Sequence, residues 1–131
     1  MLQIFVRLHS LNLVPDIQHQ PIPELVAGEW RHLFDPEGTD ALLYVRNDVE
    51  FYDCQLEAGT TSKLPLRPGW HTYLYVFDGV VEIRGESVGY TESALVSNGR
   101  AVDVLATEDS TIVAFLINPD APVTRQGTIG R

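Results

Sequence analysis

Positive charge is scarce in this sequence. Of its 131 residues, 9 are Lys or Arg and 18 are Asp or Glu, so the formal net charge is −9. Lys63 is the single lysine, and the arginines form no cluster. A protein that neutralises several phosphates needs clustered basic side chains. We therefore expect no nucleic acid among its partners.

Cysteine and long apolar runs are scarce as well. Cys54 is the one cysteine, and its place in an alternating strand pattern favours a buried, unreactive thiol. No apolar run approaches the roughly 20 residues of a membrane helix. The N-terminal stretch MLQIFVRLHSLNLV is short for a secretory signal and is interrupted by Arg7 and His9. We expect no membrane partner and a cytoplasmic location.

Helical patterns are missing, and strand patterns fill the chain. Three prolines exclude a helix from the connector around residues 15–23. Apolar, β-rich segments recur about every ten residues between Gly, Asn and Asp, which is typical of an antiparallel sandwich or barrel. Turns are predicted at Asp35–Gly38, Asp78–Gly79 and Asn98–Gly99. The expected strands are Leu2–Leu8, 41–47, 49–59, 70–79, 80–85, 92–97, 101–109 and 110–118.

The segments form one domain. We expect an N-terminal strand and extended arm over residues 1–25, a β-barrel over 26–118 and a polar C-terminal tail over 119–131. No internal repeat and no linker divides the chain.

The segment WHTYLYVFDG is apolar on both faces of its predicted strand. Alternation places Trp70, Thr72, Leu74 and Val76 on one face. The other face carries His71, Tyr73, Tyr75 and Phe77. A solvated face normally shows charged or small polar residues at alternate positions. Both faces are therefore expected to be covered, one by the core and one by another segment or a second subunit.

From Gly59 to Gly79 and on through VVEIRG, the chain resembles the frame of the first cupin motif. More narrowly, it resembles the C-terminal cupin domain of the pirin family, which includes quercetin dioxygenase-like pirins. The resemblance rests on LQIFV, LEAG, PLRPG and VFDG at the family's spacing and extends from Leu2 to Ile117. It implies an all-β fold, a cupin-type antiparallel β-barrel or jelly-roll sandwich with an extended N-terminal arm.

The resemblance also implies where cupin metal ligands would lie. A His-x-His pair would fall around Leu64 to Arg67, the glutamate at Thr72 and the second-motif histidine near Gly99–Val102. None of these residues is a histidine or a carboxylate, whereas a transition metal needs three or four N, O or S donors. We therefore expect no metal and no cofactor. Iron or manganese enters only under an alternative reading, with ligands such as His71 joined by His9 or His32.

The remaining histidines show no metal-ligand pattern. His9, His19 and His32 lack the close spacing of a metal pair and are interpreted as ordinary polar residues. His71 points away from the predicted barrel interior, as an interface or surface residue. The interior is expected either to be packed solid or to enclose a small apolar ligand. Its predicted lining is Leu64, Leu66, Thr72, Leu74, Val102 and Phe115.

The N-terminal arm predicts a homodimer. An exposed, apolar edge strand invites pairing with another chain, so the arm of one copy is expected to complete the sheet of the other. The expected interface residues are Leu2, Ile4, Phe5, Val6, His71, Tyr73, Tyr75 and Phe77.

Four functional readings follow. The favoured one is a metal-free, single-domain cupin that acts as a binding or assembly module rather than an enzyme. The alternatives are a metal-dependent, quercetinase-like dioxygenase, a small-molecule sensor, and the partner of a separately encoded first pirin domain.

Overall fold

Every regular element of the described chain is a β-strand. The computed structural model describes residues 2–39, 41–97 and 100–124. Within them the strands are β1 (Arg31–Pro36), β2 (Leu43–Val45), β3 (Val49–Leu56), β4 (Thr61–Lys63), β5 (His71–Asp78), β6 (Val80–Ile83), β7 (Glu86–Gly89), β8 (Ser93–Val96), β9 (Asp103–Ala106) and β10 (Ser110–Ile117). The all-β prediction is confirmed. The predicted turn at Asn98–Gly99 and the tail beyond 124 lie outside the described residues. No helix in the described part of the chain is long and apolar enough to cross a membrane.

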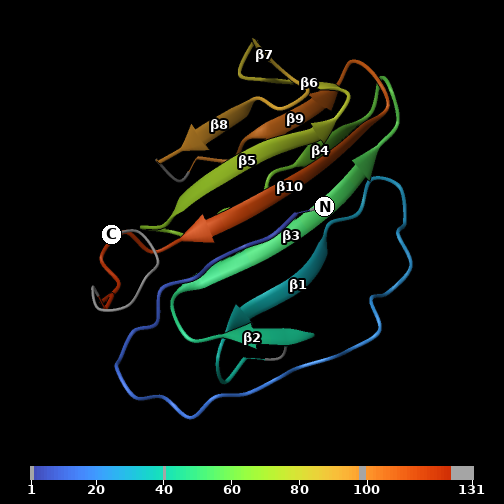
Figure 1. Cartoon of the computed structure of the whole chain (residues 1–131). Helices are drawn as coiled ribbons and strands as arrows, with labels where there is room; N and C mark the ends of the chain where they lie inside the picture. Colours follow the sequence, from blue (N-terminus) through green and yellow to red (C-terminus); the bar gives the residue numbers. More distant parts are fainter. Residues whose placement is uncertain (1, 40, 98–99, 125–131) are drawn as a thin grey trace.

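The strands form two sheets that pack face to face (Figure 1). The larger sheet has the order β2-β1-β3-β10-β5-β8, and the smaller one has the order β4-β9-β6-β7. All pairs are antiparallel except β1 with β2, which is parallel. Strands distant in sequence are therefore neighbours: β10 lies between β3 and β5, and β9 between β4 and β6.

The core lies between the sheets and follows the alternation of the sequence. Leu74 and Val76 of β5 are fully buried, as predicted for one face of that strand. Cys54 is also fully buried, and burial raises the pKa of its thiol to about 11, with a smaller effect from Asp53. The surroundings of Cys54 are therefore consistent with the unreactive thiol that the sequence predicts.

One predicted turn is fixed by a close crossing. Gly79 between β5 and β6 has φ 87°, and a Cβ atom there would lie 2.3 Å from Ser110 Oγ and 2.4 Å from Asp109 O. Ser110 Oγ in turn receives the Val80 amide at 3.1 Å. Glycine is required because both its φ and the approach of β10 exclude a side chain.

Two sequence predictions were wrong in this part of the chain. The stretch at Asp35 and Pro36, expected in a turn, is the end of β1, and the turn follows at Glu37 and Gly38. The Asp-Pro pair looked like a turn, but β2 pairs with Asp35 and Pro36 and keeps them extended. Residues Leu2–Leu8 form no strand within the chain.

The arm is attached to the larger sheet by side-chain and loop contacts. The amide of His9 donates to Arg46 O at 3.0 Å, and Gln18 bonds the amide and carbonyl of Tyr44 in edge strand β2 at 2.8 and 2.9 Å. Arg31 donates to Pro23 O at 2.6 Å and pairs with Asp53. Residues 10–25 thus run as an irregular loop past the β1–β2 edge (Figure 1), which covers an otherwise open edge.

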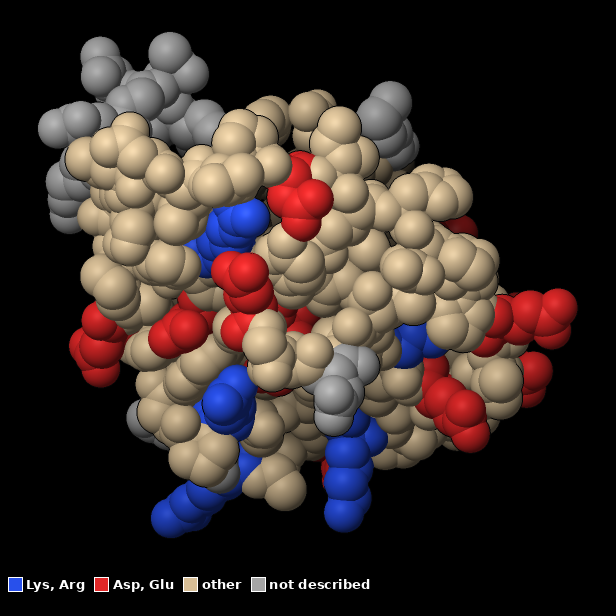
Figure 2. Space-filling model, turned by 90° about the horizontal axis from the view of Figure 1, so that it is seen from below, with Lys and Arg blue, Asp and Glu red and all other residues tan. Residues whose placement is uncertain are grey.

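The outer face of the larger sheet is also apolar. The rings of Phe34 and Phe51 lie 5.3 Å apart, and those of Phe51 and Phe115 lie 4.8 Å apart. Tyr73 and Phe77 are 38% and 39% exposed. An ion pair of Arg31 with Asp53 also lies on this outer side. On the face shown in Figure 2, acidic and basic residues are interspersed rather than gathered into one basic area.

Candidate functional site: a polar cluster between β1 and β3

Three potential metal ligands meet on the inner face of the larger sheet. His32 and Asp35 come from β1, and Glu50 comes from β3. One ligand atom from each lies within 4.8 Å of the other two. Nε2 of His32 is 3.6 Å from Asp35 Oδ2 and 3.9 Å from Glu50 Oε1. The arrangement is a compact set of one nitrogen and two oxygen donors.

A β-bulge creates this arrangement. Residues three apart in a regular strand point to opposite faces, so His32 and Asp35 would be separated. The register of β1 against β3 shifts between His32 and Phe34: His32 pairs with Tyr52, and Phe34 pairs with the next residue, Phe51. The extra residue returns Asp35 to the same face as His32. The bulge is therefore the local feature that builds the cluster.

The cluster is buried and incompletely hydrogen-bonded. Asp35 and Glu50 are each 7% exposed. Among the described residues, neither Nε2 of His32 nor Oδ1 of Asp35 has a hydrogen-bond partner, and both atoms are buried. Buried polar atoms are almost always paired, so these two atoms mark a place where a further ligand would be stabilising.

The electrostatics of Glu50 show the cost of this burial. Burial raises the pKa of the Glu50 carboxyl, and the neighbouring Asp35 raises it further, against the opposite effects of Arg67 and His32. Burial, followed by Glu50 and Asp35, also raises the pKa of Tyr52 to about 12. Tyr52 therefore stays a neutral phenol. Negative charge is held here at a cost in free energy.

A tight turn places a cation and an aromatic ring beside the cluster. The amide of Trp70 donates to Arg67 O at 3.0 Å, and the intervening Pro68 and Gly69 (φ 79°) form the centre of a type II turn. The guanidinium of Arg67 lies 4.3 Å from the centre of the Trp70 ring. Its Nη1 is 3.7 Å from Glu50 Oε2, and the side chain is 48% exposed.

The positions that the resemblance predicts for cupin ligands hold Leu64, Thr72 and Val102, which are buried. Glu50 and Thr72 both pair with Leu116 of β10, one from each side. Thr72 is fully buried, and its hydroxyl donates to Pro65 O at 3.0 Å. Leu64 and Val102 are core residues joined by a backbone hydrogen bond of 2.9 Å. Hydrocarbon side chains there cannot coordinate a metal, and Gly99 lies outside the described residues.

The predicted interior lining is placed as follows. Leu64, Leu74 and Val102 belong to the core cluster, and Leu66 packs against it. Phe115 is a correction: it lies on the outer face, against Phe51 and the N-terminal arm. Because β10 is apolar on both faces, its alternation pattern does not indicate which side Phe115 takes.

The other predicted residues lie away from the polar cluster. His71, Tyr73, Tyr75 and Phe77 are on the outer side of β5, where the first and third are half-buried. His9 is exposed and bonds Ser10, and His19 is exposed on the arm. Of the histidines proposed under the metal-dependent alternative, His32 alone reaches a ligand cluster. Sequence reasoning missed Asp35 and Glu50, because the bulge that joins them to His32 leaves no periodic signal.

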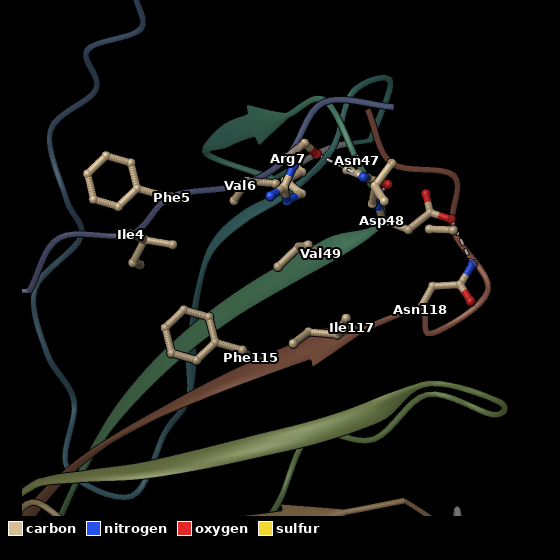
Figure 3. A pocket seen from close by; sticks show the side chains of 12 residues that line it. Ile4, Phe5, Val6, Arg7, Asn47, Asp48, Val49, Phe115, Ile117 and Asn118 are labelled. Atoms are coloured by element: carbon tan, nitrogen blue, oxygen red, sulfur yellow. Dashed lines mark hydrogen bonds between the residues drawn. The ribbon is translucent and has the colours of Figure 1, made fainter. Parts of the chain in front are cut away.

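A recess separate from the polar cluster lies on the outer face of the larger sheet, beneath the N-terminal arm (Figure 3). Its volume is about 200 Å³, and Ile4 and Val6 of the arm face Val49, Phe115 and Ile117 of the sheet. Its polar rim is occupied by internal bonds: Asn47 donates to Arg7 O at 2.8 Å, and Asn118 donates to Asp48 at 2.8 Å. The arm residues Leu2 and Phe5 remain 41% and 63% exposed.

Comparison with known proteins places the fold in a family. Residues 33–116, more than half of the chain, match the family model described as the quercetinase C-terminal cupin domain. The chain belongs to this cupin family. The matched residues include β1 from its third position onward and nearly all of β10. Asp35 and Glu50 therefore lie inside this cupin domain, and His32 lies one residue before the matched range.

Solved structures support the cupin fold. The pirin YhhW from Escherichia coli has a TM-score of 0.74 and 18% identity, covering 91% of this chain and 49% of that one. YhhW in complex with nickel(II) has a TM-score of 0.64 and 21% identity, covering 75% of this chain and 42% of that one. Quercetin 2,3-dioxygenase from Acinetobacter baumannii has a TM-score of 0.65 and 19% identity, covering 81% of this chain and 40% of that one. This cupin chain thus spans less than half the length of each. The comparison with curated proteins gives no match.

Proposed function

We propose that this cupin domain is a metal-binding module in which His32, Asp35 and Glu50 hold a divalent first-row transition ion. The observation that carries the proposal is the buried convergence of three donors in which Nε2 of His32 and Oδ1 of Asp35 lack a described partner. This departs from the sequence-based expectation of a metal-free module.

Charge supports the choice of a cation. Asp35 and Glu50 bring two negative charges into a poorly solvated place, and Arg67 offsets one of them from a distance of 3.7 Å. An unpaired buried carboxylate is costly and usually acquires a partner, a proton or a metal. A divalent ion would remove the remaining negative charge and satisfy both unpartnered atoms at once.

The donor set narrows the class of ion. Imidazole together with carboxylates suits Mn²⁺, Fe²⁺, Ni²⁺ or Zn²⁺, whereas Ca²⁺ and Mg²⁺ prefer oxygen donors alone. The present donor separations are wider than a bound ion requires, so binding would draw the three side chains together. The proposal does not depend on the positions that the resemblance predicts for cupin ligands, which hold Leu64, Thr72 and Val102.

Calorimetric titration of chelator-treated protein with Mn²⁺ and Zn²⁺ tests the proposal. We expect one ion per chain. The substitutions Asp35→Asn and His32→Gln should each weaken binding at least about tenfold. The first removes the carboxylate and the second the imidazole nitrogen, and both nearly keep the size of the side chain. Asp103→Asn, at an exposed position of β9, should leave the affinity unchanged. Absence of saturable binding, or equal affinity in all four proteins, would overturn the proposal.

The second candidate is a metal-dependent dioxygenase. It is supported by the number of donors, because three protein ligands leave coordination positions open to a substrate, as in catalytic metal sites. One similar structure is a quercetin 2,3-dioxygenase. Oxygen consumption by the metal-loaded protein with quercetin tests it: turnover that is lost in Asp35→Asn favours the enzyme, and binding without turnover favours the module.

We also propose that the domain assembles through its outer face. Tyr73, Phe77, Leu95 and Ile117 are exposed on the larger sheet, beside an arm whose apolar residues are only partly covered. A second copy of the chain is the proposed partner. A separately encoded first pirin domain is the competing one, and co-purification from the native host distinguishes them.

A further inference from the structure

Arg67 has more binding capacity than its contacts use. Its guanidinium lies over the Trp70 ring, 4.3 Å from the ring centre, in the turn that both residues close. Among the described residues, Arg67 approaches Glu50 at 3.7 Å. This distance makes an ion pair but is too long for a hydrogen bond. The side chain is 48% exposed. A partly exposed guanidinium that is positioned by a turn and an aromatic ring is suited to paired hydrogen bonds with a carboxylate.

We infer that the cluster and Arg67 together bind a small carboxylate anion, with its carboxylate between the metal ion and Arg67 and its body against Trp70. The inference rests on the metal site proposed above. With a divalent ion the site changes from a net negative to a net positive charge, because the ion outweighs the one charge that Arg67 leaves uncompensated. An anion is then attracted, and three protein donors leave it a place on the ion.

The order of events follows from the same charges. Before an ion is bound, Asp35 and Glu50 repel an anion, so the anion should bind poorly to metal-free protein. After an ion is bound, the anion should bind, and by linkage it must strengthen binding of the ion by the same factor. An aromatic acid can pack on the Trp70 ring, and benzoate is a suitable probe because it complexes free metal ions weakly.

The simpler role of Arg67 is to neutralise Glu50. The two roles predict different effects of benzoate on Mn²⁺ binding by Arg67→Met. If Arg67 only neutralises Glu50, its loss changes the affinity for the ion and leaves any effect of benzoate intact. If it also binds the anion, Mn²⁺ alone should bind Arg67→Met as tightly as wild type or tighter, since a repelling cation is gone, while the effect of benzoate disappears.

The experiment is a calorimetric titration of Mn²⁺ into wild type and variants, with and without benzoate. Benzoate should raise the Mn²⁺ affinity of wild type about tenfold, a common size for such coupling, and should not raise that of Arg67→Met. Benzyl alcohol, the neutral counterpart, should have no effect. Arg84→Met, which removes the same charge from the exposed β6–β7 turn, should behave as wild type.

The outcomes separate the two proposals. If Mn²⁺ binds but benzoate leaves its affinity unchanged, or strengthens it equally in wild type and Arg67→Met, the anion site is refuted and the metal site stands. If Mn²⁺ does not bind at all, both are refuted. Strengthening by benzoate in wild type and Arg84→Met but not in Arg67→Met supports both.

Discussion

The imidazole of His32 lies flat on the ring of Tyr52, with centroids 4.3 Å apart and planes 8° apart. The two residues are paired across β1 and β3 immediately before the bulge. Tyr52 packs against the core, so the stack fixes the plane of the imidazole. That plane directs Nε2 of His32 toward Asp35 and Glu50.

Removing the stack should therefore weaken the metal site without removing a ligand. We expect Tyr52→Leu to lower Mn²⁺ affinity about tenfold, the usual size of an effect on ligand orientation. Tyr52→Phe keeps the ring and loses only a long contact of 3.4 Å from the hydroxyl to Glu50, so it should stay within about twofold of wild type. Similar affinities in the Leu and Phe variants would show that the stack does not orient His32.

The pKa of Glu50 predicts a pH-dependent stability. Folding raises this pKa above the ordinary value of 4.5, so the folded state favours the protonated carboxyl. The free energy of unfolding of metal-free protein should therefore fall as the pH rises from below 4.5 through the raised pKa. At pH 7, Glu50→Gln should raise the melting temperature of metal-free protein by about 3 °C, and at pH 3.5 it should change little.

Bound metal should reverse the effect of Glu50→Gln on the melting temperature. With Zn²⁺ in excess, wild type gains stability from binding to the native state, and Glu50→Gln loses a ligand and melts lower than wild type. Glu57→Gln, at an exposed loop position, is the matched control and should shift neither curve. A lower melting temperature of Glu50→Gln at pH 7 without metal would contradict the burial argument.

The crossing at Gly79 predicts an unequal response of two glycines. Gly79 and Gly28 have nearly the same φ, 87° and 85°, but a Cβ at Gly28 meets nothing within 4 Å. Gly28→Ala should cost about 1 kcal/mol from backbone strain alone. Gly79→Ala should cost roughly 2 kcal/mol more, because β10 must move. Urea denaturation of both variants measures the difference, and equal losses would mean that β10 yields freely.

The proposed dimer makes the arm necessary for assembly. Light scattering should report a dimer for the full chain and a monomer after deletion of residues 1–12. Tyr73→Ser combined with Phe77→Ser should have the same effect if the outer face of β5 takes part, whereas Tyr90→Ser, an exposed aromatic outside β5, should not. A monomeric full chain, or a deletion that remains dimeric, contradicts this assembly.

The sequence alone determined the class of the fold and much of its interior. Alternation in β3 and β5 separates core from outer residues because successive side chains in a strand point to opposite faces. Gly79 marks its turn because few other residues tolerate that φ. The resemblance to the first cupin motif from Gly59 to Gly79 could also be recognised in the sequence. At the positions that the resemblance predicts for metal ligands, the sequence has Leu64, Thr72 and Val102.

Only the tertiary structure decided where the polar chemistry lies. His32 and Asp35 share a face because β1 bulges against β3, and a bulge is set by pairing between strands rather than by local composition. Glu50 joins them because β1 and β3 are neighbours in the sheet. The outward side of Phe115 was likewise decided by neighbouring strands, since β10 is apolar on both faces.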